Sequence, residues 1–389
     1  MAKRPTVFFL LDGLSDEIVN NKTPLREANK ENINYISKRS FLGKFRIIEK
    51  WDESYGKSVS HLALLRIFGY EEIIGRGALE VIGNDMPFEN GNLALRGNFS
   101  TVEKDILIDR RAERNLLNLD NLIEEVKENV DIKFSYQIKR GYAHRVAFLL
   151  KGNHSKNISY NDVDVGEKIK RILPLDTTSV VTAKILQDFV DKSFSILDKS
   201  KFNEERERNG IKKANYFIFR NGENYLPRLK KKFKKDSLAI VENGVVKGCC
   251  ILAGFKILTV PEIISSNKID HEKTIEYVFK NIEENLDKFK FIFTHLKAFD
   301  EASHDKNFEL KKHYIEVFDK NIGKLIDKDL KIVITTDHST SSLNGKHIFS
   351  EVPLLIYGIK KRSSVKMFDE ISISKLRNTI SPKQLWRLI

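Results

Sequence analysis

Short apolar runs alternate with amphipathic helical patterns along much of this 389-residue chain. The runs are TVFFLL (6–11), ANYFIF (214–219), LAIVE (238–242), KILTV (256–260), FKFIFT (289–294), LKIVITT (330–336) and VPLLIYG (352–358), and the helical patterns lie at 178–199, 274–287 and 308–326. Continuous apolar strands separated by helices are typical of a parallel sheet buried on both faces. The sequence therefore predicts an α/β fold, with a mostly parallel sheet covered by helices on both faces.

The segment 92–151 has a different pattern, because strands dominate it. Four strand-like runs are predicted there, NLALRGNFSTV, DILIDRR, IKFSYQI and RVAFLLKG, with a single helix at 116–128. An α+β segment that interrupts an α/β pattern is typical of an inserted domain. We therefore expect an α+β cap domain at 87–167, inserted into a core made of 1–86 and 168–389.

Composition and local sequence exclude several other classes of protein. Apolar residues make up 41% of the chain and charged residues 31%, which is typical of an ordered globular protein. No apolar run approaches the roughly 18 residues of a membrane span. The start, MAKRPTVFFLLDG, is unlike a signal peptide because its apolar part is short and leads into Asp12. Cys249 and Cys250 are adjacent in an apolar stretch, where a disulfide is not expected, so a cytoplasmic location fits.

The formal net charge of +13 requires an explanation. Lysine and arginine are spread along the chain, with one dense run, RLKKKFKKD, at 228–236 and a smaller one at 360–362. Such a balance can indicate nucleic acid, an anionic membrane surface or a small anionic substrate as the partner. It can equally be the charge of a solvated surface, so both interpretations of the run at 228–236 stay open.

Polar residues of metal-binding type follow the predicted strands. Ligands of open α/β sheets bind at the carboxyl ends of the strands, so these positions are the most informative about function. The candidate metal ligands there are Asp12, Asp300, His304, Asp337, His338 and His347. Taken alone, each has an ordinary structural explanation: Asp300 and His304, four residues apart, suit a surface ion pair, and Asp12 suits a helix cap.

Three aspartates and three histidines at one sheet edge form a ligand set with a chemical preference. Carboxylate and imidazole groups together suit Mn²⁺ or Zn²⁺, and Mg²⁺ where carboxylates dominate. Six protein ligands are too many for one catalytic ion that keeps an open position. They suit two ions about 3.5–4 Å apart, an arrangement that binds both the attacking and the leaving oxygen of a phosphoryl transfer.

The order of these motifs resembles that of a known superfamily. Asp-Gly after the first strand, then D-x-x-x-H, DHST and a histidine before VPLLIY, resembles the alkaline phosphatase superfamily and, more closely, the archaeal-type cofactor-independent phosphoglycerate mutases. The likeness covers nearly the whole chain. Further segments match in the same order: KTPLREANKENINYI (22–36), GRGALEVIG (75–83), RGNFSTV (96–102), DRRAER (109–114), HRVAFLLKG (144–152), NEERERNGIKKAN (203–215) and HLKAFDEASHDKNFE (295–309).

The resemblance implies a two-metal site and a particular reaction. The two sites for divalent ions (Mn²⁺, Co²⁺, Zn²⁺ or Mg²⁺) would consist of Asp300, His304 and His347 in one case and of Asp12, Asp337 and His338 in the other. The reaction would be the interconversion of 3-phosphoglycerate and 2-phosphoglycerate through a phosphoserine, without 2,3-bisphosphoglycerate as a cofactor.

The resemblance also implies which residues contact this small anionic substrate. The cap would bind its phosphate and carboxylate through Asp109, Arg110, Arg111 and Arg145. Arginine suits this role because its planar fork meets both groups in bidentate fashion. Lys297 would neutralise charge on the transferred group. A polyanionic substrate also accounts for part of the positive net charge.

The chain departs from the family at the nucleophile. The family's segment reads approximately G-S-D-x-[AS]-[NH]-L, whereas this chain has GKSVSHL at 56–62, which places Lys57 where the family has its serine. A shift of one residue makes Ser58 the expected nucleophile, because a hydroxyl near a helix N-terminus is well placed for an anion.

Three functions therefore stay open. They are an active mutase that uses Ser58, a metal-dependent phosphohydrolase or phosphotransferase in which water replaces the serine, and a non-catalytic basic protein that binds nucleic acid through 228–236. The six-ligand set argues against the last of these. RNA binding would also require aromatic platforms or a known module, and the sequence contains neither, so a nucleic-acid partner is not expected.

Overall fold

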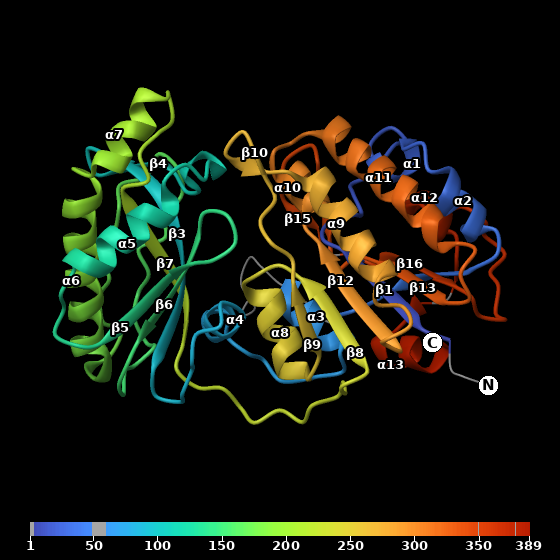
Figure 1. Ribbon diagram of the computed structural model, residues 1–389, viewed down its shortest axis with the longest axis horizontal. Coiled ribbons are helices and arrows are strands. Elements are labelled where there is room, and N and C mark those ends of the chain that lie inside the picture. Colours follow the sequence, from blue (N-terminus) through green and yellow to red (C-terminus); the bar gives the residue numbers. More distant parts are fainter. Residues whose placement is uncertain (1–3, 49–59, 349, 378) are drawn as a thin grey trace.

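The computed structural model describes residues 4–48, 60–348, 350–377 and 379–389, which form two lobes (Figure 1). The core lobe, on the right of Figure 1, holds the central sheet and both ends of the chain. The cap lobe, on the left, comprises residues 93–223 and holds a second sheet. Helix α4 (Arg76–Gly83) lies between them. None of the helices in the described part of the chain is long and apolar enough to span a bilayer.

The core lobe is built on one eight-stranded sheet. The strand order is β17 (Thr379–Ile380), β2 (Phe41–Phe45), β16 (Val352–Tyr357), β13 (Lys331–Thr335), β1 (Thr6–Leu11), β12 (Phe291–Leu296), β8 (Ser237–Val241) and β9 (Lys256–Thr259). Strand β1 is parallel to both β12 and β13, and β8 is parallel to both β12 and β9. Strand β16 is antiparallel to β13 and β2. The predicted mostly parallel sheet is therefore confirmed.

Strand β1 is apolar throughout because both faces of the sheet are covered. Side chains alternate between the two faces along a strand. Val7 and Phe9 enter one buried cluster, whereas Phe8 and Leu10 enter a different cluster on the opposite face. A strand in this position has no solvent-facing side, so the period-two alternation of polar and apolar residues disappears.

Helices cover both faces of this sheet, as the sequence predicted. The face with Phe9 packs against α1 (Pro24–Glu27), α2 (Glu31–Ser37), α9 (His271–Glu283), α10 (Ala298–His304), α11 (Phe308–Ile322) and α12 (Glu370–Ser374). The face with Phe8 packs against α3 (Ser60–Ile67), α8 (Val245–Ala253) and α13 (Pro382–Leu388).

The cap lobe is an antiparallel sheet with three helices against one face. Its strands are β4 (Ile106–Asp109), β3 (Leu93–Glu103), β6 (Arg145–Leu150) and β5 (Tyr136–Arg140) in that order, with β7 (Tyr216–Glu223) also paired to β3. The helices are α5 (Leu119–Asn129), α6 (Val180–Leu197) and α7 (Lys201–Arg208). The four strands and the helix that the sequence predicts between 92 and 151 are all present.

Strand β7 joins the cap sheet, which corrects two expectations. The sequence places the run 214–219 in the central parallel sheet, but this run forms β7, antiparallel to β3, with Phe99 opposite Phe217. The segment from 168 to Glu223, which the sequence-based division assigns to the core, consequently packs in the cap lobe through α6, α7 and β7. An apolar run shows that a strand is buried but does not identify its partner strand, which here lies more than a hundred residues away.

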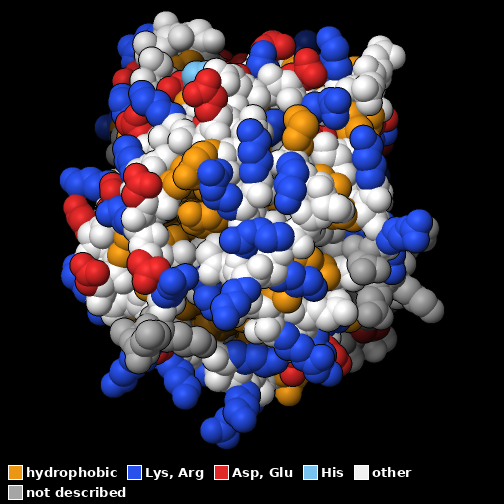
Figure 2. Space-filling view, turned by 90° about the vertical axis from the view of Figure 1, so that its right-hand side faces the viewer, with side chains coloured by type: hydrophobic (Ala, Val, Ile, Leu, Met, Phe, Trp, Pro, Cys, Tyr) orange, Lys and Arg blue, Asp and Glu red, His pale blue; other side chains and the backbone are white. Residues whose placement is uncertain are grey.

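Basic side chains are spread widely over the surface of the core lobe. Figure 2 shows Lys and Arg side chains across one end of the molecule, with few acidic side chains among them. The run 228–236 lies between β7 and β8, where Tyr70 donates a hydrogen bond to the backbone oxygen of Lys230 and Lys232 stacks over the Tyr70 ring. The positive charge is therefore distributed, and this run is only one part of it.

The backbone of helix α4 lies directly against the backbone of both lobes. A Cβ atom at Gly77 would lie 2.3 Å from the backbone oxygen of Ala94 on β3, and one at Gly83 would lie 1.9 Å from that of Gly244, which precedes α8. A Cβ at Gly248 of α8 would likewise lie 2.2 Å from the backbone oxygen of Leu79. These positions accept glycine alone because the backbones leave no room for a side chain.

We expect Gly83→Ala to lower the free energy of unfolding by about 1–3 kcal/mol, the usual cost of inserting a methyl group into a filled space. Urea unfolding followed by circular dichroism measures this change. Ser195→Ala on the exposed side of α6 is the control and should leave stability nearly unchanged. Equal stability of both variants would contradict the close packing of α4 on α8.

Candidate metal centre

The six candidate metal ligands come together at the carboxyl ends of β1, β12 and β13. One follows β1 directly, two lie on α10 after β12, two follow β13, and the last lies on the short strand β15 (His347–Ile348), which pairs with β14 (Ser339–Thr340). The cluster consists of Asp12, Asp300, His304, Asp337, His338 and His347, joined by His295. It combines three groups of three ligand atoms, and Asp12 and Asp300 each belong to two of them.

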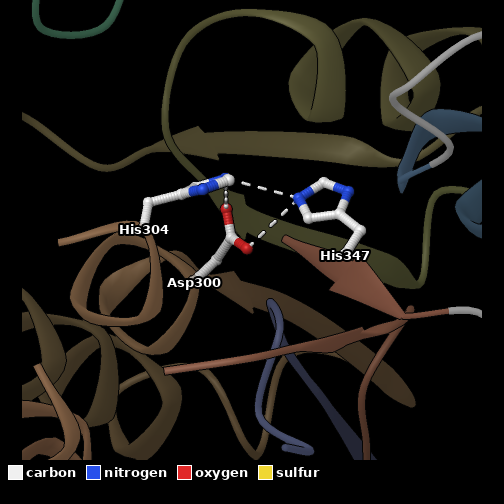
Figure 3. Close-up of side chains that lie close together, drawn as sticks. All are labelled: Asp300, His304 and His347. Atoms are coloured by element: carbon white, nitrogen blue, oxygen red, sulfur yellow. Dashed lines mark hydrogen bonds and ion pairs between the residues drawn. The ribbon is translucent and has the colours of Figure 1, made fainter. Parts of the chain in front are cut away.

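Asp300, His304 and His347 form the first half of the cluster (Figure 3). Asp300 Oδ2 lies 3.3 Å from His304 Nε2, and Asp300 Oδ1 lies 3.5 Å from His347 Nε2. The two Nε2 atoms are 3.3 Å apart. Asp300 and His304 are one helical turn apart on α10, whereas His347 approaches from β15. A carboxylate and two imidazoles that converge on one point are a suitable partial shell for a divalent cation.

Asp12, Asp337 and His338 form the second half. His338 Nε2 lies 3.3 Å from Asp12 Oδ1 and 3.4 Å from Asp337 Oδ2. Both of these carboxylate oxygens are buried, and neither accepts a hydrogen bond from any residue in the described ranges. Buried carboxylate oxygens without a partner are costly in free energy. A cation at this point would provide the missing partner, so the donor set fits a second metal ion.

Hydrogen bonds behind the cluster turn the histidine Nε2 atoms toward the carboxylates. Thr340 Oγ1 donates its one proton to Asp300 Oδ1 at 2.8 Å, so it must accept from His338 Nδ1, 3.0 Å away. His304 Nδ1 donates to the backbone oxygen of Gly345 at 2.8 Å. In the neutral form of each ring, these partners place the proton on Nδ1 and direct the Nε2 lone pair toward the cluster, which is the tautomer that metal binding requires.

The electrostatics of the cluster also fit a cation. Burial, together with the negative charges of Asp337 and Asp300, raises the pKa of Asp12 well above its usual range. Burial alone lowers the pKa of His338, but the nearby carboxylates Asp337 and Asp12 outweigh it and raise this pKa to about 10. The carboxylates therefore attract positive charge, which a divalent ion supplies without a proton.

His295 is a member of the cluster that the sequence did not single out as a ligand. It lies near the end of β12, opposite Leu10 of β1, and its Nε2 is 3.6 Å from Asp12 Oδ2. Burial lowers its pKa to about 4, so the ring is neutral near pH 7. The feature of the sequence that could have identified His295 is its position in the strand beside β1, one residue before the end of that strand.

Asp109 and Arg110 make their contacts within the cap lobe. Asp109 Oδ1 accepts hydrogen bonds from the backbone N–H groups of Arg111 at 2.6 Å and of Glu113 at 3.2 Å. Arg110 forms an ion pair with Asp162. Asp109 therefore fixes the turn that carries Arg111, and the charge of Arg110 is already balanced by an aspartate of the cap.

Arg111 and Arg145 form no ion pair with any residue that the structure describes. Burial and the positive charges of Arg114 and Arg145 lower the pKa of Arg111 to about 10. Arg114 itself is paired with Asp305, at 2.6 Å, across the two lobes. Adjacent cations without a carboxylate partner are stabilised by an anion that joins them, so Arg111 and Arg145 make a candidate anion site.

Two further half-buried arginines escaped the sequence-based selection. They are Arg76, at the start of α4, and Arg220, on β7. Burial and the charge of Arg145 lower the pKa of Arg76 to about 10, whereas Glu80 and Asp12 act in the opposite direction. Arg76 therefore lies within electrostatic reach of both Arg145 and the metal cluster. The feature of the sequence that could have identified Arg76 is the resemblance of GRGALEVIG (75–83) to the family.

Lys297 lies at the junction of the two lobes. Its Nζ is 2.7 Å from Glu242 Oε2 and 3.6 Å from the centre of the Tyr142 ring, which belongs to the cap. Its charge is therefore already paired with a buried carboxylate. The expected nucleophile Ser58 and its neighbour Lys57 lie outside the described residues.

Comparisons with known proteins agree with this geometry. The Metalloenzyme superfamily profile matches residues 4–383. The chain is 32% identical over 387 residues to "2,3-bisphosphoglycerate-independent phosphoglycerate mutase 1" of Archaeoglobus fulgidus, which covers 95% of this chain and 93% of that protein. It is 33% identical over 373 residues to the 2,3-bisphosphoglycerate-independent phosphoglycerate mutase of Pyrococcus furiosus, with 92% and 89% covered.

Solved structures share the fold. A Pyrococcus horikoshii protein superposes with a TM-score of 0.75 at 25% identity, covering 100% of this chain and 97% of that one. A cofactor-independent phosphoglycerate mutase from Thermoplasma acidophilum has a TM-score of 0.56 at 23% identity, with 99% of each chain covered.

The fold and the ligand cluster thus define a member of the Metalloenzyme superfamily. Its relatives are similar over almost their whole length. Within this superfamily the chain belongs to the 2,3-bisphosphoglycerate-independent phosphoglycerate mutases.

Thr340 gives a test of the hydrogen bonds behind the ligands. Thr340→Val removes the hydroxyl that holds both Asp300 and His338, so we expect Mn²⁺ affinity to fall about 10–100-fold. Thr340→Ser keeps the hydroxyl and should retain most of the affinity. Titration calorimetry with Mn²⁺ on the metal-stripped proteins measures both. Unchanged affinity in Thr340→Val would show that this hydroxyl does not orient the ligands.

Proposed function

We propose that this protein interconverts 3-phosphoglycerate and 2-phosphoglycerate by phosphoryl transfer at a two-metal site, independently of 2,3-bisphosphoglycerate. The observation that carries the proposal is the convergence of three aspartates and three histidines at one sheet edge, in a chain whose relatives are named as such mutases. A cytoplasmic location goes with this activity. The finding that no helix in the described ranges could span a membrane is compatible with that location.

The proposed ligand sets follow the two halves of the cluster. One ion, chosen from Mn²⁺, Co²⁺, Zn²⁺ and Mg²⁺, would be held by Asp300, His304 and His347, and a second by Asp12, Asp337 and His338. When bound, such ions offset the negative charge on the phosphoryl oxygens and hold them in place.

The cap would hold the rest of the substrate. Arg111 and Arg145 offer guanidinium groups without a carboxylate partner, which suits them to a phosphate or carboxylate. Asp109 would act by fixing the turn of Arg111, and Arg110 would become available only if it exchanges Asp162 for substrate. Lys297 would similarly divide its charge between Glu242 and the transferred group.

The direct test is a ³¹P NMR assay of the purified protein with 3-phosphoglycerate. After treatment with EDTA and reconstitution with Mn²⁺, we expect the signal of 2-phosphoglycerate to grow without added 2,3-bisphosphoglycerate, and no growth in the metal-free sample. Release of inorganic phosphate without the isomer would instead identify a phosphohydrolase. Neither product, together with a mobility shift of labelled RNA at moderate salt, would favour the non-catalytic basic protein.

Removal of a shared ligand should abolish both metal binding and activity. In Asp300→Asn we expect mutase activity at the level of the metal-free protein, because Asp300 contacts both His304 and His347. Glu309→Gln on the exposed face of α11 is the control and should behave as the wild type. Full activity of Asp300→Asn with wild-type Mn²⁺ stoichiometry would exclude the proposed site.

A cap arginine should govern substrate binding rather than metal binding. We expect Arg145→Gln to raise KM about 10–100-fold, the equivalent of losing hydrogen bonds to a charged group, with Mn²⁺ affinity unchanged. Arg171→Gln is the control, since Arg171 pairs with Asp191 at 3.6 Å on the cap surface. An unchanged KM in Arg145→Gln would remove Arg145 from the substrate site.

A further inference from the structure

Helix α3 begins beside the second half of the metal cluster. Ser60, its first residue, places Oγ 3.1 Å from His338 Nε2. This is the same nitrogen atom that lies 3.3 Å from Asp12 Oδ1 and 3.4 Å from Asp337 Oδ2. The Ser60 hydroxyl therefore faces the point on which the proposed second ion's ligands converge.

The direction of this contact follows from the tautomer of the neutral ring, which is the form that binds a metal. In neutral His338 the proton on Nδ1 is donated to Thr340 Oγ1, so Nε2 accepts and the Ser60 hydroxyl donates to it. With a cation on His338 Nε2, the Ser60 oxygen would be a neighbouring ligand atom. A hydroxyl bound beside a divalent ion loses its proton more readily and becomes a better nucleophile.

The helix holds Ser60 firmly in this position. Ser60 is half-buried, whereas the next residues, His61 to Leu65, are buried. Of these, Ala63, Leu64 and Leu65 pack in the cluster that α8 and the central sheet share. The side chain therefore projects from an anchored element and not from a free loop. The N–H groups of the first helical turn also favour negative charge near Ser60, which a phosphate on its oxygen would supply.

We propose that Ser60 is the residue that accepts and returns the phosphoryl group, in place of the Ser58 that the sequence suggested. This inference rests on the proposed function. In the first transfer the bond between Ser60 Oγ and phosphorus forms while the bond between phosphorus and the glycerate oxygen breaks. The proton of the Ser60 hydroxyl passes through water to that glycerate oxygen. The return transfer to the neighbouring hydroxyl of glycerate reverses both changes, so no proton, electron or phosphate is gained or lost.

The proposal also accounts for the difference between residues 56–62 and the nucleophile segment of the family. Lys57 stands where the family has its serine, and Lys57 cannot form a comparable phosphoester. Ser60 is three residues further along the chain, and it carries the hydroxyl that the structure places against His338.

The test locates the phosphate on the protein. The Mn²⁺-loaded protein is mixed with 3-phosphoglycerate, quenched in acid, digested and analysed by mass spectrometry, with Ser58→Ala, Ser60→Ala, Ser60→Thr and the control Ser195→Ala treated in parallel. We expect phosphate on Ser60 in the wild type and in Ser195→Ala. In Ser60→Ala we expect no phosphoenzyme and a loss of isomerisation of at least about 1,000-fold, as for other nucleophile deletions.

Two measurements separate a chemical from a structural role. Ser60→Ala should keep Mn²⁺ affinity within about threefold of the wild type and the same unfolding midpoint, because all six carboxylate and imidazole ligands stay. Ser60→Thr retains a hydroxyl and should recover part of the phosphoenzyme. Loss of Mn²⁺ binding in Ser60→Ala would show instead that the serine is a structural ligand.

The outcomes distinguish this inference from the proposed function. Isomerisation with phosphate on Ser58, or with full activity in Ser60→Ala, overturns the role of Ser60 and leaves the mutase intact. Phosphate on Ser60 with release of inorganic phosphate and no isomer supports Ser60 and overturns the mutase. A wild type that forms neither isomer nor phosphoenzyme overturns both.

Discussion

The mutual repulsion of three closely spaced carboxylates, two of them buried and the third half-buried, is the constraint on which the rest of this structure depends. Asp12, Asp300 and Asp337 approach one another at the carboxyl edge of the central sheet, where burial strengthens their interaction. Isolated negative charges in such a place are too costly to persist, so each has to be balanced by a histidine, a hydrogen bond or a cation. The order β13-β1-β12 creates this situation, because it brings three strand ends to one point.

The loop that carries His347 is held by a second charged group beneath it. Lys311 of α11 is fully buried, pairs with Asp16 at 2.8 Å and donates to the backbone oxygen of Thr340 at 3.0 Å. Asp16 in turn accepts from the backbone N–H of Ser342. The segment that presents Thr340 and His347 is thus supported by an ion pair that solvent does not reach, which holds these two candidate site residues in position.

The sequence predicted those parts that depend on local pattern. Continuous apolar runs identified six of the eight strands of the central sheet, though not β2 or β17, and the six candidate ligands followed because each lies just beyond a strand or in the next loop. Strand β7 was misassigned because its apolar residues fit either sheet, and only pairing with β3 decides between them. His295, Arg76 and Ser60 were not selected as site residues, since each looks like an ordinary strand or helix residue until tertiary contacts bring it to the cluster.

The glycine contacts of α4 restrict how the two lobes can move. On one side α4 touches the backbone of β3, and on the other it touches the start of α8, at glycines that bring the backbones together. An opening motion would have to break these backbone contacts together with the ion pair between Glu80 of α4 and Arg96 of β3, at 2.9 Å, and the packing of Val81 against Ala94. The contacts of α4 therefore oppose any change in the spacing between the two lobes.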